Sequence, residues 1–150
     1  AYLTQNLQNL ERALEKALIY ALTTRYAENP PTDRSRLDSI YGSEMRLVSQ
    51  RYREEMDVAT LFVESLMDCM PWDYWQKDGQ PKPRTREALA VLDYIAEKEP
   101  NHPGANHYYI HAAEAVHPDL ATPSADKLTG MELNSGHLVH MPSRVIVQSI

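Results

Sequence analysis

The stretch from Glu87 to Ala115 reads EALAVLDYIAEKEPNHPGANHYYIHAAEA, and it decides the fold class. Its apolar residues recur every three or four positions, which is the spacing of one buried face of an α-helix. Glu99-Pro100-Asn101 interrupts this spacing because proline cannot continue a helix, and Pro103 then suits the first turn of a new helix. The stretch therefore predicts two helices, over residues 85–98 and 103–116, joined by a tight break.

The same spacing continues on both sides of this stretch. A first helix is expected to run to about residue 26, where Asn29-Pro30-Pro31 ends it; its apolar face consists of Leu3, Leu7, Leu10, Leu14 and Leu18. Further helices are predicted over residues 33–52, 57–70, 124–131 and from about 135, with Asp33 and Asp57 as N-caps and a kink at Pro142. No alternating pattern typical of a strand is present, so the expected fold class is all-α.

One segment breaks the helical rhythm. Residues 71–84 read PWDYWQKDGQPKPR, with three prolines and three large aromatic side chains. Trp72, Tyr74 and Trp75 would be costly to leave in water, so we expect a structured loop with both indoles at least partly buried on the helices. The alternative is that Trp72 and Trp75 face a ligand or a binding groove.

Composition limits the function classes. A length of 150 residues is that of one ordinary domain, and we expect a single helical-repeat domain over residues 1–150, cut from a longer protein. A net charge of −6 argues against a nucleic-acid binder, and no apolar run is long enough to span a membrane. Cys69, the single cysteine, is expected to be an inert thiol in a helix.

Two helix junctions repeat at a distance of thirty-three residues, one beginning at Glu97 and the other at Gly130. The pattern Ala88, Leu92, Ile95 and Pro100-Asn101 resembles the second helix of the tetratricopeptide repeat, and Ala121, Ala125 and Leu128 match it more weakly. Leu133 stands where the repeat has proline, and the first-helix tryptophan is missing. This resemblance implies antiparallel helix pairs stacked as a right-handed superhelix.

A closer resemblance covers residues 21–143. The stretches DVATLFVESLM, MPWDYW, DGQPKP, EALAVLDYIAEKEPNHPGANHYYIHAAEA and GHLVHMPS are similar to a bacterial family described only as tetratricopeptide-repeat proteins. The resemblance implies the fold and no activity. In that family the last motif usually continues as His-Met-Pro-Ser-His-Ile-Tyr, whereas Arg144 follows Ser143 here.

All six histidines fall between residues 102 and 140. His107 and His111 are four residues apart, and His137 and His140 are three apart, so each pair shares one helix face. In a tetratricopeptide-like stack the two helices would be neighbours, which would bring four imidazoles into one groove. The helix before them would carry Glu64 within reach of the same groove.

Such a set of ligands suits zinc, iron or manganese, with Tyr108, Tyr109 or Glu114 as partners of the ligands. The alternative is a polar, peptide-binding groove that includes Tyr108. HYYIH lacks the glutamate of the HExxH protease motif, so that mechanism has no base. His102 and His117 adjoin prolines and are expected to be capping or surface residues.

Two functions are therefore carried forward. The first is a non-enzymatic scaffold that binds an unidentified protein or peptide in a concave groove. The alternative is a metal-binding protein, with metal-dependent catalysis as one use of the ion. The apolar run Val145-Ile146-Val147 is expected to pack on the sixth helix, to fray, or to contact another subunit.

Overall fold

The computed structural model describes residues 2–131 and 136–148, without the side chains of residues 2–8, 139 and 146–148. Within this part of the chain the regular structure is helical and contains no strand, which confirms the all-α prediction. Seven helices are described: α1 (Tyr2–Thr23), α2 (Ser35–Arg51), α3 (Met56–Asp68), α4 (Pro83–Lys98), α5 (Pro103–Ala113), α6 (Pro118–Thr129) and α7 (Gly136–Gln148). Among them, none is both long and apolar enough to cross a membrane.

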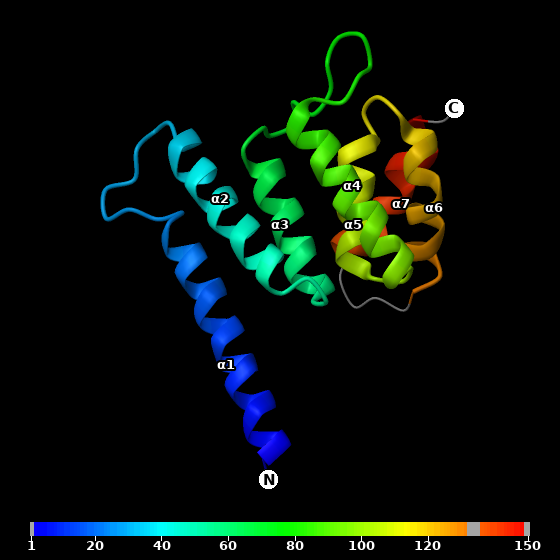
Figure 1. The fold of residues 1–150 in the computed structure, drawn as a ribbon. Helices are drawn as coiled ribbons and strands as arrows, with labels where there is room; N and C mark the ends of the chain where they lie inside the picture. Colours follow the sequence, from blue (N-terminus) through cyan, green and yellow to red (C-terminus); the bar gives the residue numbers. More distant parts are fainter. Residues whose placement is uncertain (1, 132–135, 149–150) are drawn as a thin grey trace. The chain divides into compact units, whose positions relative to one another are not determined.

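The chain forms two compact units, Ala1–Cys69 and Met70–Ile150. In the first unit α2 packs against both α1 and α3, and α2 and α3 run side by side in opposite directions (Figure 1). Met45 and Val48 of α2 are buried, as are Phe62, Val63 and Leu66 of α3. The three-four spacing of these residues explains why each helix has one buried face.

The predicted apolar face of α1 is only partly covered. Leu14 and Leu18 are half-buried, whereas Leu10 is exposed, and the side chains of Leu3 and Leu7 lie outside the described part. The predicted N-caps also differ. Asp33 accepts a hydrogen bond from the Ser35 backbone N–H (2.9 Å) just before α2, but Asp57 lies in the first turn of α3, which begins one residue earlier.

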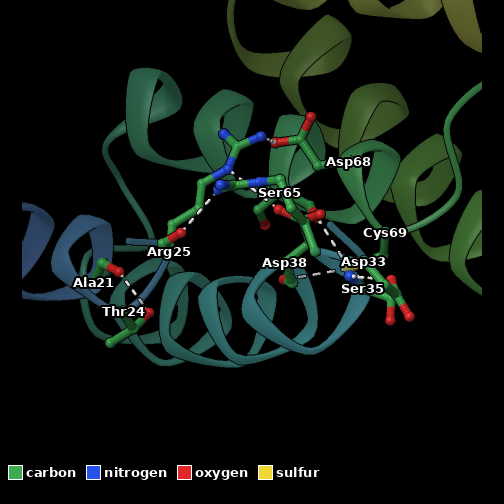
Figure 2. Close-up of polar contacts among 10 residues, drawn as sticks. Ala21, Thr24, Arg25, Asp33, Ser35, Asp38, Ser65, Asp68 and Cys69 are labelled. Atoms are coloured by element: carbon green, nitrogen blue, oxygen red, sulfur yellow. Dashed lines mark hydrogen bonds and ion pairs between the residues drawn. The ribbon is translucent and has the colours of Figure 1, made fainter. Parts of the chain in front are cut away.

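A polar cluster joins the segment after α1 to the two following helices (Figure 2). The Arg25 side chain donates from Nε to Oδ1 of Asp38 (3.3 Å), and its Nη2 forms an ion pair with Oδ2 of Asp68 (2.6 Å). Asp38 lies on α2 and Asp68 ends α3. Cys69, half-buried beside this cluster, donates its thiol to the backbone oxygens of Asp38 and Ser65.

In the second unit α5 occupies the central position: it packs against α4, α6 and α7, and α6 also packs against α7. One hydrophobic core cluster of this unit consists of Ile110 and Ala113 of α5, Ala121, Ala125 and Leu128 of α6, and Met141 and Val145 of α7. The alanines let the helix backbones approach closely. Val145 therefore packs against α6, which was one of the three expectations for the apolar run 145–147. The side chains of Ile146 and Val147 lie outside the described part.

The sixth helix begins six residues earlier than predicted. Pro118 does not merely end α5: it occupies the first turn of α6, where a missing N–H costs no hydrogen bond. Pro123 lies inside the helix. The buried neighbours Ala121, Ser124 and Ala125 hold this segment against the core, so packing outweighs the hydrogen bond that Pro123 removes.

The loop between Met70 and Lys82 is structured, as predicted. Trp75 donates its Nε1 hydrogen to the backbone oxygen of Ala112 (2.7 Å), and its ring meets that of His117 edge-on. His117 also contacts the Gly79 oxygen (2.9 Å), and Gly79 adopts a positive φ of 80° where the loop reverses. The expected burial is wrong for Trp72, which is 67% exposed.

Candidate metal centre

The N-terminal end of α5 fixes the helix that carries the first two histidines. His102 is the N-cap, and its Nδ1 accepts a hydrogen bond from the Ala105 N–H (3.2 Å), as expected for a capping residue. The buried Asn106 side chain donates to the backbone oxygens of Pro100 (3.0 Å) and His102 (2.9 Å). These contacts, together with the buried Ile110, set the rotation of α5.

His107 and His111 lie on one face of α5, and their ring centroids are 4.7 Å apart. Four residues advance a helix by slightly more than one turn, so the two rings lie one above the other. Both side chains are half-buried. The sequence spacing alone therefore predicts this part of the site correctly.

The first turn of α7 brings a third imidazole to the same place. The His137 ring lies 4.8 Å from that of His107 and 5.8 Å from that of His111. The three rings meet because α7 packs against α5, as predicted for the two histidine-bearing helices. His137 itself is exposed, so the cluster has one side toward solvent.

The distances between nitrogens fit coordination of one ion. One ring nitrogen from each of His107, His111 and His137 lies within 4.8 Å of the other two. The Nε2 atoms of His107 and His137 are 3.2 Å apart. Two imidazole nitrogens on a tetrahedral zinc ion, each at about 2.0–2.1 Å, would be separated by about 3.3 Å.

A buried carboxylate orients His111. Glu114, with a side chain only 2% exposed, places Oε1 3.3 Å from Nδ1 of His111. A carboxylate only accepts hydrogen bonds, so this contact holds the proton of a neutral His111 on Nδ1 and leaves Nε2 with a free lone pair. A carboxylate on the far nitrogen is the usual partner of a histidine that binds a metal.

Glu114 is itself neutralised by a cation. Nε of Arg144 lies 2.7 Å from Oε2 of Glu114 and binds the oxygen that does not face His111. The Arg144 guanidinium also lies 5.9 Å from the centre of the Trp72 ring, which in turn meets the His111 ring edge-on at 5.5 Å. His111, Glu114, Arg144 and Trp72 therefore form one connected group.

The two histidines of α5 are neutral at physiological pH. Burial, followed by the neighbouring His111 and His137, lowers the pKa of His107 to about 4. Burial, followed by Arg144 and His137, lowers the pKa of His111 to about 4. Neutral imidazoles present the lone pairs that a metal ion requires, and no proton has to be displaced from these two rings near pH 7.

Other residues singled out in the sequence lie elsewhere. His140 is exposed, and its Nδ1 lies 3.2 Å from the Ser143 hydroxyl, so it does not join the three converging imidazoles. Glu64 lies on α3 in the first unit, where it interacts electrostatically with Arg25 and Tyr41. The three-residue group found among the described residues does not include it.

The tyrosines of α5 have separate partners. Tyr108 stacks on His107, with ring centroids 5.0 Å apart and planes only 15° from parallel. Tyr109 donates its hydroxyl to Asp93 of α4 (3.0 Å), and burial, with this carboxylate, raises the pKa of Tyr109 to about 12. Tyr108 therefore flanks the cluster, whereas Tyr109 joins α5 to α4.

Arg144 is the residue of this site that sequence reasoning did not identify. The i, i+3 spacing of His111 and Glu114 indicates their contact, but thirty residues separate Glu114 from Arg144. Only the packing of α7 on α5 brings the latter pair together.

In comparisons with known proteins, no family model, curated protein or solved structure matches the chain. The site must therefore be interpreted from its own residues.

Proposed function

We propose that the chain binds a divalent transition-metal ion through His107, His111 and His137. The observation that carries this proposal is the convergence of one nitrogen from each ring within 4.8 Å of the other two. The pairing of His111 with the buried Glu114 supports it, because that contact leaves Nε2 available to an ion.

The ligand types favour zinc among the candidate ions. Imidazole suits zinc, copper, iron and nickel, whereas manganese prefers carboxylate oxygens, and the group contains three imidazoles. Three protein ligands also leave a tetrahedral ion one position for water or a substrate, as in catalytic rather than purely structural zinc sites. A binding site used in catalysis thus agrees better with this ligand number than a structural site does.

The test is a cobalt(II) titration of untagged, chelator-treated protein. Cobalt(II) takes the same geometry as zinc, and a tetrahedral ion absorbs visible light much more strongly than an octahedral one. The proposal expects strong absorption that saturates at one equivalent and is lost when zinc is added. Weak, non-saturating absorption from a folded chain would refute a three-histidine site.

We also propose that the helices form a tetratricopeptide-like, right-handed superhelix. Consecutive helices pack on one another within each unit, and α5 packs on α7 as the first helices of neighbouring repeats do. An experimentally determined structure tests this arrangement: a left-handed stack, or separated helix pairs, would be incompatible with it.

A scaffold function is the second candidate, and the apolar surface of α1 favours it. Ile19, Tyr20 and Leu22 are all exposed on this helix. Exposed apolar groups of this kind are typical of surfaces that contact other proteins. Replacing Ile19 and Leu22 by Glu should abolish any concentration-dependent rise in mass in sedimentation experiments, and an unchanged mass at all concentrations would count against self-association through α1.

A further inference from the structure

Trp72 is placed unusually for so large an apolar side chain. It is 67% exposed, and its backbone adopts a φ of 61°, a left-handed conformation that is strained for a non-glycine residue. Nevertheless its ring lies beside His111 and under the Arg144 guanidinium. The strained backbone therefore presents a flat aromatic surface at the edge of the histidine cluster.

Arg144 retains unused hydrogen-bonding capacity at the same place. Its Nε binds Glu114, and the side chain is 37% exposed. In the described part of the chain Arg144 forms its hydrogen bond through Nε, and both terminal Nη groups lack an acceptor. A guanidinium in this state offers a planar pair of donors that matches the two oxygens of a carboxylate.

The charge of the site also favours an anion. A divalent ion would contribute two positive charges and Arg144 one, against one negative charge from Glu114. An anionic ligand at the remaining coordination position would lower the electrostatic free energy of the whole group.

We propose that the site recognises a small carboxylate ligand that carries an apolar or aromatic group. One carboxylate oxygen coordinates the metal ion, the Arg144 Nη groups donate to the carboxylate, and the apolar group lies on Trp72. This inference rests on the proposed metal site, because without the ion the carboxylate would lose its principal partner.

The experiment uses cobalt(II)-loaded protein and three probes: acetate, benzoate and inorganic phosphate. Coordination of a carboxylate changes the visible spectrum of the ion, so each dissociation constant can be read from the spectrum. Benzoate is expected to bind about fivefold more tightly than acetate, because its ring contacts Trp72. Phosphate is expected to bind more weakly than benzoate; a phosphate affinity equal to or above that of benzoate would overturn the choice of carboxylate.

Two variants separate the parts of the proposal. Trp72→Ala should remove the preference for benzoate while leaving acetate affinity unchanged. Arg144→Lys should weaken both carboxylates by about tenfold, because lysine lacks the planar pair of donors. Arg84→Lys, on the exposed first turn of α4, is the matched control and should change neither constant.

Cobalt affinity is measured for every variant before the probes are added. Failure of the wild-type protein to bind cobalt would refute the metal site and this inference together. Tight cobalt binding with a spectrum that no carboxylate changes would refute this inference alone. A normal benzoate preference in Trp72→Ala would exclude the assigned role of that ring.

Discussion

Nδ1 of His111 lies 3.3 Å from Oε1 of the buried Glu114. This carboxylate therefore orients the ring of a candidate metal ligand through the nitrogen that does not face the proposed ion. The other oxygen of Glu114 lies 2.7 Å from Nε of Arg144. Both oxygens of this carboxylate thus have partners, and a buried charge that would otherwise be costly is compensated. The contact assigns Glu114 a positioning role in the proposed metal site.

Glu114→Gln should lower metal affinity by about 10–100-fold, the usual effect of removing the partner of a metal-binding histidine. The amide keeps the shape of the side chain but removes the charge that favours the Nδ1–H form of His111. Competition titration with a chromophoric chelator gives the affinity, and circular dichroism confirms folding. Glu97→Gln, on the exposed surface of α4, is the control. Equal affinity for both variants would exclude a positioning role.

The metal-free protein should lose stability as pH falls from about 6.5 to about 4. In the unfolded chain His107 and His111 have a pKa near 6.5, and in the folded chain their pKa is about 4. Between these values the unfolded state binds more protons, so the free energy of unfolding decreases as pH is lowered and, for these groups, levels off below 4.

Urea denaturation at several pH values measures this slope. His107→Asn should make the decrease between pH 6.5 and 4 shallower, because one depressed titration is removed. His140→Asn, at an exposed position, is the matched control. The same slope in wild type and His107→Asn would contradict the assigned burial of His107.

The spacing of apolar residues in the sequence predicts the helices, because helix formation depends on interactions between residues close together in the chain. Ala88, Leu92 and Ile95 recur on one face and are buried, and Pro103 begins α5 as its fixed φ favours. The i, i+4 pair His107 and His111 follows from the same geometry. Its approach to His137 was predictable only through the repeat pattern, because thirty residues separate them.

Features that depend on tertiary packing could not be predicted in this way. Pro123 is tolerated inside α6 because its neighbours are buried, which no local rule states. Trp72 is exposed although its hydrophobicity favours burial, and its contact with Arg144 joins segments more than seventy residues apart. The i, i+3 spacing of His137 and His140 likewise could not show that only His137 faces α5.

Arg25→Met should destabilise the first unit by about 1.5–3 kcal/mol, the range for hydrogen bonds to charged groups. The substitution keeps most of the apolar stem but leaves Asp38 and Asp68 without the guanidinium that lies between them (Figure 2). Chemical denaturation measures the loss. Arg12→Met, at an exposed position of α1, should cost less than 0.5 kcal/mol, about the effect of an ordinary surface change. Equal losses would show that the cluster contributes nothing specific.

The two tryptophans should have different fluorescence. Trp75 is partly covered and bonded to the Ala112 oxygen, whereas Trp72 is exposed beside His111. Trp72→Phe should therefore leave blue-shifted emission from Trp75, and Trp75→Phe should leave emission typical of a hydrated indole. Copper(II) should quench Trp72 more strongly than Trp75, because Trp72 contacts His111, one of the proposed metal ligands. Stronger quenching of Trp75 would contradict the placement of the site.

The most direct measurement compares zinc retained by His137→Ala and His140→Ala after gel filtration of untagged protein. The two residues lie one turn apart on α7, so the variants differ in which imidazole is lost and hardly at all in the helix affected. We expect about one zinc ion per chain in the wild type and in His140→Ala, and close to none in His137→Ala, which loses one of three ligands. Equal retention by the two variants, or loss in His140→Ala alone, would contradict a site built from His107, His111 and His137.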